Sequence, residues 1–183
     1  MYYYYSMLLL LHPIRFFKEV NAPSTGMIFI NLVVTLVSLT GYLYYFDINP
    51  FFFSFVYNAL TYFLLIFGIY YFSLRFLILS FTEHKDFGAV FGMLTYVGLL
   101  SVPYSILIIL SPFSLLSELL YVLFLFHIAL SLNGILIRFI SFTKLQKLFV
   151  TSIITPIIVF VPFFILVIVY GILFGIALGR AFG

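Results

Sequence analysis

Residues 119–137 read LLYVLFLFHIALSLNGILI, and this run of 19 residues contains no charged side chain. A helix crosses the hydrocarbon core of a bilayer, which is about 30 Å thick, in roughly 20 apolar residues. Four further uncharged runs of at least this length flank it, at 20–46, 48–74, 87–117 and 148–179. Five such runs leave little of the 183-residue chain outside a membrane. We therefore predict a polytopic membrane protein.

The composition indicates that these runs are helices. Hydrophobic residues make up 66% of the chain and charged residues 7%, against about 25% charged residues in soluble domains. Strands of membrane barrels alternate apolar and polar side chains over about 10 residues, whereas these runs are apolar on every face. Helices satisfy their own backbone hydrogen bonds in lipid. The predicted fold class is all-α, with one transmembrane domain over residues 1–183.

Turn signals and charges set the limits of the predicted spans. The five spans are expected at about 26–46, 51–74, 88–110, 115–137 and 149–174. Pro103 lies within the third span, and Pro156 and Pro162 lie within the fifth. Because proline removes a backbone donor and clashes with the preceding turn, we expect Pro103 to bend the third span.

Residues 12–22 are predicted to form an amphipathic helix before the first span. Pro13 suits a first helical turn, and Arg15 and Glu19 are spaced to pair across one turn. On a helical wheel, the apolar residues of one face are Ile14, Phe16, Phe17 and Val20, and the charged residues of the other face are Arg15, Lys18 and Glu19. We therefore expect this helix to lie in the membrane interface with its apolar face in lipid.

The basic residues predict the orientation of the chain. Seven of the eight fall on the side of the N-terminus: Arg15, Lys18, Arg75, Lys85, Arg138, Lys144 and Lys147. The opposite side holds only Arg180. Since cytoplasmic loops carry an excess of Lys and Arg, the N-terminus is predicted to be cytoplasmic and the C-terminus to lie outside the cytoplasm.

Four polar residues inside the predicted spans are the candidates for intramembrane chemistry: Asn31, Asn58, His127 and Asn133. Polar side chains in lipid cost free energy unless they are paired, and they often mark pathways. A role for His127 in proton relay or metal binding has little local support, because no second potential ligand stands three or four residues away. Hydrogen bonding between helices is therefore favoured for all four.

Glycine spacing indicates close helix packing. Gly171, Gly175 and Gly179 recur every four residues in the fifth span, and Gly88 and Gly92 have the same spacing in the third. Small residues at this spacing let helix backbones approach closely. Packing within the chain is favoured over oligomerisation, and neither interpretation is catalytic.

Several classes of chemistry are excluded or unsupported. The absence of cysteine rules out disulfides, thiolate catalysis and cysteine-ligated metals. No glycine loop for nucleotides, HExxH or GxSxG motif is found, and no run of basic residues is suited to nucleic acid. The chain is therefore predicted to be non-enzymatic, without a cofactor, a metal or a nucleic-acid partner.

The order of these features resembles a known family. Residues 12–17 (HPIRFF) resemble the P-x-x-F-F first helix in the prokaryotic branch of the Yip-domain family, membrane proteins named for interaction with Ypt/Rab GTPases. Residues 87–88 (FG), 95–98 (TYVG) and 102–103 (VP) resemble the third span of that family, and the basic stretch 138–147 precedes the last span, as it does there. The resemblance implies five spans, a cytoplasmic N-terminus and a membrane-organising or partner-binding role without known catalysis.

One departure from the family limits what the resemblance implies. Eukaryotic members carry a long hydrophilic N-terminal tail associated with GTPase contact, whereas fewer than 15 residues precede the amphipathic helix here. GTPase binding is therefore not expected, and the expected partners are the lipid bilayer and either other membrane proteins or a second copy of the chain. Two alternatives stay open: a small-solute channel or transporter with broken helices, and an accessory subunit of a larger membrane complex.

Overall fold

The computed structural model describes residues 2–46, 63–83, 86–111 and 114–162, together with three residues between 164 and 168. Within these residues the chain is helical and contains no strand, so the predicted all-α class is confirmed for this part. The first half of the second predicted span and the end of the fifth lie outside the described residues.

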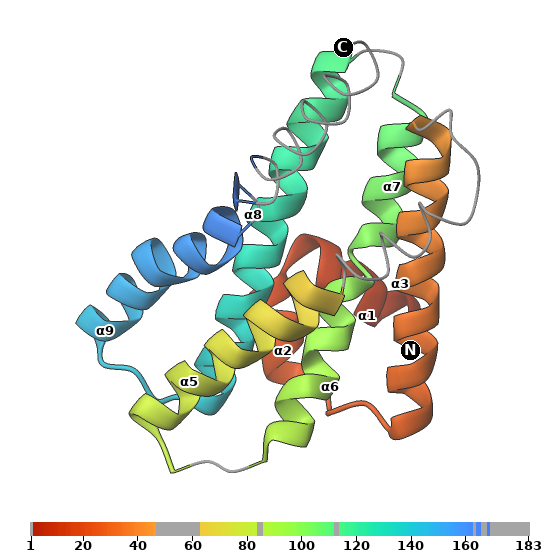
Figure 1. The fold of residues 1–183 in the computed structure, drawn as a ribbon. Helices are drawn as coiled ribbons and strands as arrows, with labels where there is room; N and C mark the ends of the chain where they lie inside the picture. Colours follow the sequence, from red (N-terminus) through yellow and green to blue (C-terminus); the bar gives the residue numbers. More distant parts are fainter. Residues whose placement is uncertain are drawn as a thin grey trace, which may run out of the picture.

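Figure 1 shows how the described elements are arranged. In chain order they are α1 (Tyr2–Leu11), α2 (Pro13–Glu19), α3 (Thr25–Phe46), η1 (Phe63–Tyr70), α5 (Tyr71–Phe81), α6 (Phe87–Gly98), α7 (Ser101–Ile109), α8 (Ser114–Phe139), α9 (Lys144–Phe149) and η2 (Val150–Ile154). Both η elements are π-helical. α3 and the α6–α7 pair run in one direction, and α8 runs back beside α7 (Figure 1).

In the part of the chain that the structure describes, three helices are long and apolar enough to cross a membrane. They are Phe87–Ile109, Leu115–Phe139 and Lys144–Pro162, and they coincide with the third, fourth and fifth predicted spans. Two shorter apolar helices are Thr25–Ser38, which overlaps the first predicted span, and Gly68–Phe81, which overlaps the end of the second and continues beyond it. By length and composition, the chain is thus compatible with a membrane protein.

Apolar side chains cover much of the outer surface of the described helices, and several polar side chains are buried between them. Large apolar side chains point outward, with Phe76 71% exposed and Leu115 76% exposed. On α3, by contrast, the side chains described as buried are Asn31 and Thr35. Soluble monomers rarely expose large contiguous apolar surfaces, so this arrangement fits helices that face lipid and pack through polar groups.

The helix that contains Pro103 is interrupted one turn before that residue. Proline cannot donate to the carbonyl four residues earlier, which belongs to Leu99. α6 ends at Gly98, and the amides of Leu99 and Leu100 bond instead to the carbonyls of residues 96 and 97, at 3.1 Å each. The interruption between α6 and α7 lies where the predicted bend was expected.

A second irregularity precedes Pro156. The π-helical turn η2 occupies Val150–Ile154, and the carbonyl that loses its donor to Pro156 belongs to Ser152 within it. A π-turn widens the helix by one residue and frequently accompanies such a local disruption. Each of these irregularities thus precedes a proline, Pro103 in the predicted third span and Pro156 in the predicted fifth.

The N-terminal amphipathic segment forms a helix whose surroundings differ from the prediction. Pro13 stands in the first turn of α2, and Arg15 Nε lies 2.6 Å from Glu19 Oε1, as its spacing predicts. However, Phe17 is 0% exposed and Phe16 3% exposed, because α2 packs against α8 (Figure 1) and the ring of Phe16 meets that of Tyr96 on α6. The prediction that this apolar face enters lipid is therefore corrected: its phenylalanines enter the protein.

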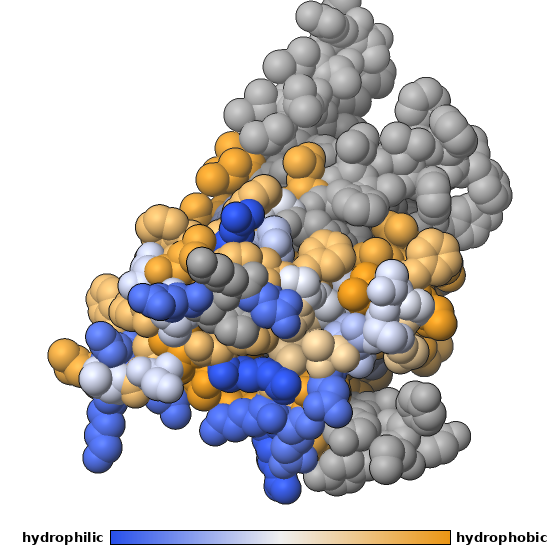
Figure 2. Space-filling model, turned by 90° about the horizontal axis from the view of Figure 1, so that it is seen from below, coloured by the Kyte–Doolittle hydropathy of each residue, from blue (hydrophilic) through white to orange (hydrophobic). Residues whose placement is uncertain are grey.

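Charged and polar side chains gather at one end of the molecule. Figure 2 views this end from below and shows hydrophilic residues across it. α8 finishes here, and α3 and α6 begin here (Figure 1). Lys18 at the end of α2 and Lys144 and Lys147 on α9 are exposed. We call this surface the charged end.

Candidate functional site

Asn31 joins α3 to α6 through a buried hydrogen bond. Its Nδ2 atom donates to Thr95 Oγ1 at 3.1 Å, and that hydroxyl donates in turn to the carbonyl oxygen of Gly92 at 2.7 Å. One turn along α3, Thr35 Oγ1 donates to the carbonyl oxygen of Asn31 at 2.7 Å. The amide of Asn31 therefore serves helix packing.

Gly92 lies at a close approach beside this bond. A Cβ atom at Gly92 would lie 2.9 Å from Pro23 Cδ, in the linker between α2 and α3. At Gly88 a Cβ atom would meet only Asp86 Oδ1 at 3.5 Å, which is ordinary van der Waals contact. The two glycines thus have different surroundings. The predicted glycine face at Gly171, Gly175 and Gly179, and the candidate Asn58, lie outside the described residues.

Asn133 joins α8 to the irregular start of the last helix. Thr155 Oγ1 donates to Asn133 Oδ1 at 2.7 Å and also contacts the carbonyl oxygen of Val150 at 3.0 Å. Asn133 Nδ2 lies 3.5 Å from the carbonyl oxygen of Thr151 within η2. The asparagine therefore meets the last helix at its π-turn, where the regular backbone pattern is broken.

His127 pairs with Tyr104 across the α7–α8 interface. The tyrosine hydroxyl lies 3.0 Å from Nδ1 of the imidazole. Among the described residues, no group of three His, Cys, Asp or Glu side chains is placed to hold a metal ion. His127 therefore takes part in a hydrogen bond between α7 and α8.

Two residues that the sequence analysis did not single out hold α2 against α8. A Cβ atom at Gly134 would lie 3.1 Å from Ile14 Cα and 3.1 Å from Phe17 Cβ, so glycine permits the close approach of α2. One turn further along α8, Arg138 Nη1 donates to the carbonyl oxygens of Phe17, at 2.9 Å, and of Val20. The last carbonyls of a helix have no intrahelical donor, and Arg138 supplies one.

A sequence signal for this contact exists but is weak. Gly134 and Arg138 are four residues apart, so they share one face of α8. A glycine inside an apolar span often marks a close backbone contact. However, neither residue indicates which segment packs there, and Arg138 fits the basic stretch before the last span equally well.

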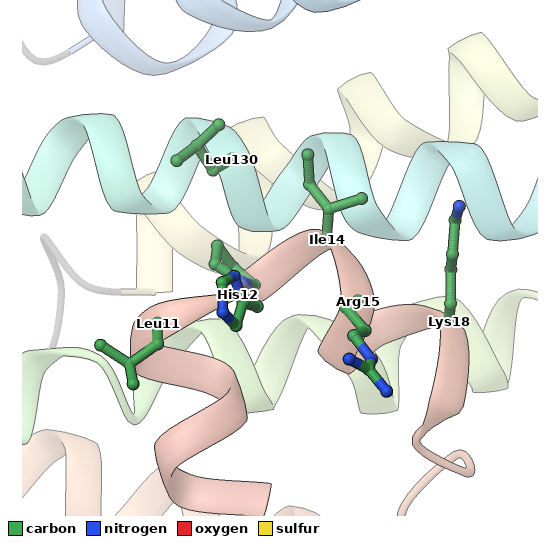
Figure 3. A pocket seen from close by; sticks show the side chains of 7 residues that line it. Leu11, His12, Ile14, Arg15, Lys18 and Leu130 are labelled. Carbon is green, nitrogen blue, oxygen red and sulfur yellow. The ribbon is translucent and has the colours of Figure 1, made fainter.

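A hollow of about 510 Å³ lies beside this contact (Figure 3). It is lined by Leu11, His12, Pro13, Ile14, Arg15, Lys18 and Leu130. The residues come from the end of α1, from α2 with the bend before it, and from the middle of α8. Ile14 and Lys18 point toward α8, whereas Arg15 points away from it (Figure 3).

The hollow combines basic and apolar side chains. His12, Arg15 and Lys18 are its basic residues, and Arg15 is bonded to Glu19 at 2.6 Å. For Lys18, no ion pair is found among the residues that the structure describes. The ammonium group of Lys18 is thus the cation best placed to meet an anion in this hollow.

Comparison with protein-family models, curated proteins and solved structures gives no match to this chain. The resemblance of residues 12–17 to Yip-domain proteins therefore stays a prediction. The functional interpretation depends on the paired polar groups inside the helices, the charged end and the hollow beside α2.

Proposed function

We propose that this chain is a non-enzymatic integral membrane protein with a Yip-like arrangement of five spans, which binds partners or organises the bilayer through its charged end. The observation that carries this proposal is the separation of its polar groups. Within the described helices, asparagine and histidine side chains bond to neighbouring helices. The exposed lysines, by contrast, gather at the charged end.

The internal hydrogen bonds support packing in preference to solute transport. Asn31 and Asn133 are buried, and each bonds to a threonine on another helix. Polar side chains that line a solute pathway need to face a water-filled or substrate-filled space. Side chains that bond across a helix interface instead hold two helices in register.

Orientation is the second part of the proposal. Three described helices are long enough to span, and α3 extends over 22 residues from the charged end. With Lys18, Arg138, Lys144 and Lys147 on or near the charged end, the excess of basic residues on the cytoplasmic side makes this end cytoplasmic. The N-terminus is then assigned to the cytoplasmic side, and the C-terminus lies outside the cytoplasm.

The Yip-like arrangement draws support from α2. Residues 13–17, which match the pattern P-x-x-F-F, form most of this helix. Phe16 and Phe17 are buried, and the ring of Phe16 meets that of Tyr96 edge-on at 5.5 Å. The two aromatic residues of the pattern thus have a packing role in this chain.

Affinity purification after cross-linking in intact membranes tests the proposal. We expect the wild-type chain to be recovered in mild detergent as a defined complex, with itself or with another membrane protein. Reversing two exposed charges of α9, by Lys144→Glu and Lys147→Glu, should abolish the complex. Glu118→Gln, an exposed position at the other end of α8, is the control and should retain it.

Two outcomes contradict this proposal in different ways. A complex that survives the α9 double variant indicates association through the spans, which is the accessory-subunit alternative. A monomer whose reconstituted vesicles show protein-dependent solute flux indicates the channel or transporter alternative.

A further inference from the structure

We propose that the hollow between α2 and α8 binds one anionic glycerophospholipid. The phosphate group lies at Lys18, and an acyl chain lies along Leu11, Ile14 and Leu130. This inference deepens the proposed membrane-organising role and rests on the proposed orientation, which places the charged end in the cytoplasmic leaflet.

The lining of the hollow calls for a ligand with two chemically different parts. Its volume of about 510 Å³ is within the range of roughly 300–1,000 Å³ typical of ligand pockets. One part of the lining is basic, and the other contains exposed aliphatic side chains, with Leu11 66% and Leu130 44% exposed. A small anion would make no contact with the aliphatic side chains, and a neutral lipid would not offer a net negative charge to the lysine.

The hollow also has the orientation that a lipid requires. Lys18 lies one residue from the end of α2, near the point where Arg138 at the end of α8 meets Phe17. Leu130 precedes Arg138 by eight residues (138 minus 130) on the same helix. At about 1.5 Å per residue, Leu130 is roughly 12 Å further from the charged end. The hollow thus extends from the level of the headgroups towards the hydrocarbon.

Lys18 is the group that selects for charge. Arg138 is occupied by backbone carbonyls of α2, and Arg15 is bonded to Glu19 and points away from α8 (Figure 3). Lys18 points toward α8 over the hollow (Figure 3). An ammonium group is a compact point charge that suits a phosphate oxygen, and anionic lipids are concentrated in the cytoplasmic leaflet.

A lipid fits the apolar end of the hollow better than a soluble partner does. The exposed side chain of Leu130 belongs to the helix Leu115–Phe139, which is long and apolar enough to span. In the proposed orientation this residue is at hydrocarbon depth. A hydrated peptide or a free phosphate ion does not reach that depth without losing its water.

Lipid titration of the purified full-length chain in neutral detergent, followed by native mass spectrometry, tests this site. Phosphatidylglycerol and phosphatidylcholine with identical short acyl chains are the probes, and we expect tighter binding of phosphatidylglycerol. Lys18→Gln should weaken that binding about fivefold, the effect of one basic residue near an anionic surface. Arg75→Gln removes an exposed basic side chain on α5, outside the hollow, and should leave the affinity unchanged.

Two further variants separate the site from a general loss of structure. Lys18→Arg keeps the charge and should retain most of the affinity. Leu130→Trp fills the apolar end without changing any charge and should weaken the binding of both lipids. Equal effects of Lys18→Gln and Arg75→Gln, or no effect of Leu130→Trp, would overturn the proposal.

A final experiment distinguishes a lipid phosphate from a free phosphate ion as the ligand of the hollow. Inorganic phosphate at millimolar concentration should fail to displace phosphatidylglycerol, because it lacks the acyl chain. Displacement by inorganic phosphate would make the hollow a free-anion site and contradict the inference. These readouts use purified protein, whereas the proposed function is tested by complexes formed in the membrane, so the two can fail separately.

Discussion

Arg138 donates a hydrogen bond to the backbone carbonyl oxygen of Phe17, with 2.9 Å between Nη1 and the oxygen. The same guanidinium nitrogen bonds to the carbonyl oxygen of Val20. The end of α8 is thereby joined to a helix more than 100 residues earlier in the chain. The carbonyl of Phe17 lies in the last turn of α2, where carbonyls lack a donor within the helix, and Val20 directly follows the helix. One side chain therefore both caps α2 and fixes its position.

The first prediction concerns this cap. Arg138→Met keeps most of the side-chain length but leaves the carbonyls of Phe17 and Val20 without a donor. Hydrogen bonds to charged groups contribute about 1.5–3 kcal/mol, so we expect a lower free energy of unfolding and faster hydrogen exchange in α2. Lys147→Met, at an exposed lysine, is the control. Equal exchange in α2 for the two variants would show that Arg138 does not hold this helix.

The second prediction uses two glycines with opposite surroundings. Gly134→Ala places a Cβ atom 3.1 Å from Phe17 Cβ, whereas at Gly26 nothing lies within 4 Å. Overpacking typically costs about 1–3 kcal/mol, so thermal unfolding in detergent should show a clear loss for Gly134→Ala. Gly26→Ala should be neutral or slightly stabilising, since alanine favours a helix. Comparable melting temperatures for the two variants would contradict the close approach of α2.

The sequence could predict that α2 has a buried face, but it could not predict what buries that face. Phe16 and Phe17 require an apolar environment, and both lipid and the protein interior supply one. The amphipathic pattern is therefore the same for a helix on the membrane surface and for a helix packed on α8. The contact depends on Gly134 and Arg138, which are distant in the chain and reveal no pairing on their own.

The third prediction is a coupling between Asn31 and Thr95. A double-mutant cycle with Asn31→Leu and Thr95→Val should give a coupling free energy of about 0.6–2 kcal/mol, the range for polar pairs between membrane helices. Asn31→Leu combined with Thr155→Val is the control cycle. These two sites share no hydrogen bond in the described network, so their effects should add. A coupling free energy no larger than that of the control cycle would show that the hydrogen bond between Asn31 and Thr95 does not contribute to stability.

The fourth prediction tests the contact at the π-turn. Thr155→Val preserves the shape of the side chain but removes the donor to Asn133 Oδ1. We expect Thr155→Val to lower the free energy of unfolding by about 1–2 kcal/mol, measured by thermal unfolding. Thr155→Ser keeps the hydroxyl and should retain most of the wild-type stability. The hydroxyl of Thr151 bonds within its own helix, and Thr151→Val should therefore cost less. Equal losses at the two positions would argue against a special role for the pair of Thr155 and Asn133.

What the sequence predicted well is local or compositional. Run length and apolarity predict helices because the backbone in lipid has few other ways to satisfy its hydrogen bonds. Pro103 predicts the interruption after Gly98 because its effect is confined to one turn. The partners of Asn31, Asn133 and His127 could not be predicted, since they depend on the relative register of helices that are far apart in the sequence.

The central claim is that the chain spans the membrane five times with its charged end in the cytoplasm. Because the chain contains no cysteine, single cysteines introduced at the exposed Ser141 and at Phe182 can be labelled with a membrane-impermeant reagent in intact cells. The account predicts labelling at position 182 before permeabilisation and at position 141 only afterwards. Labelling of position 141 from outside, or protection of position 182, would contradict it.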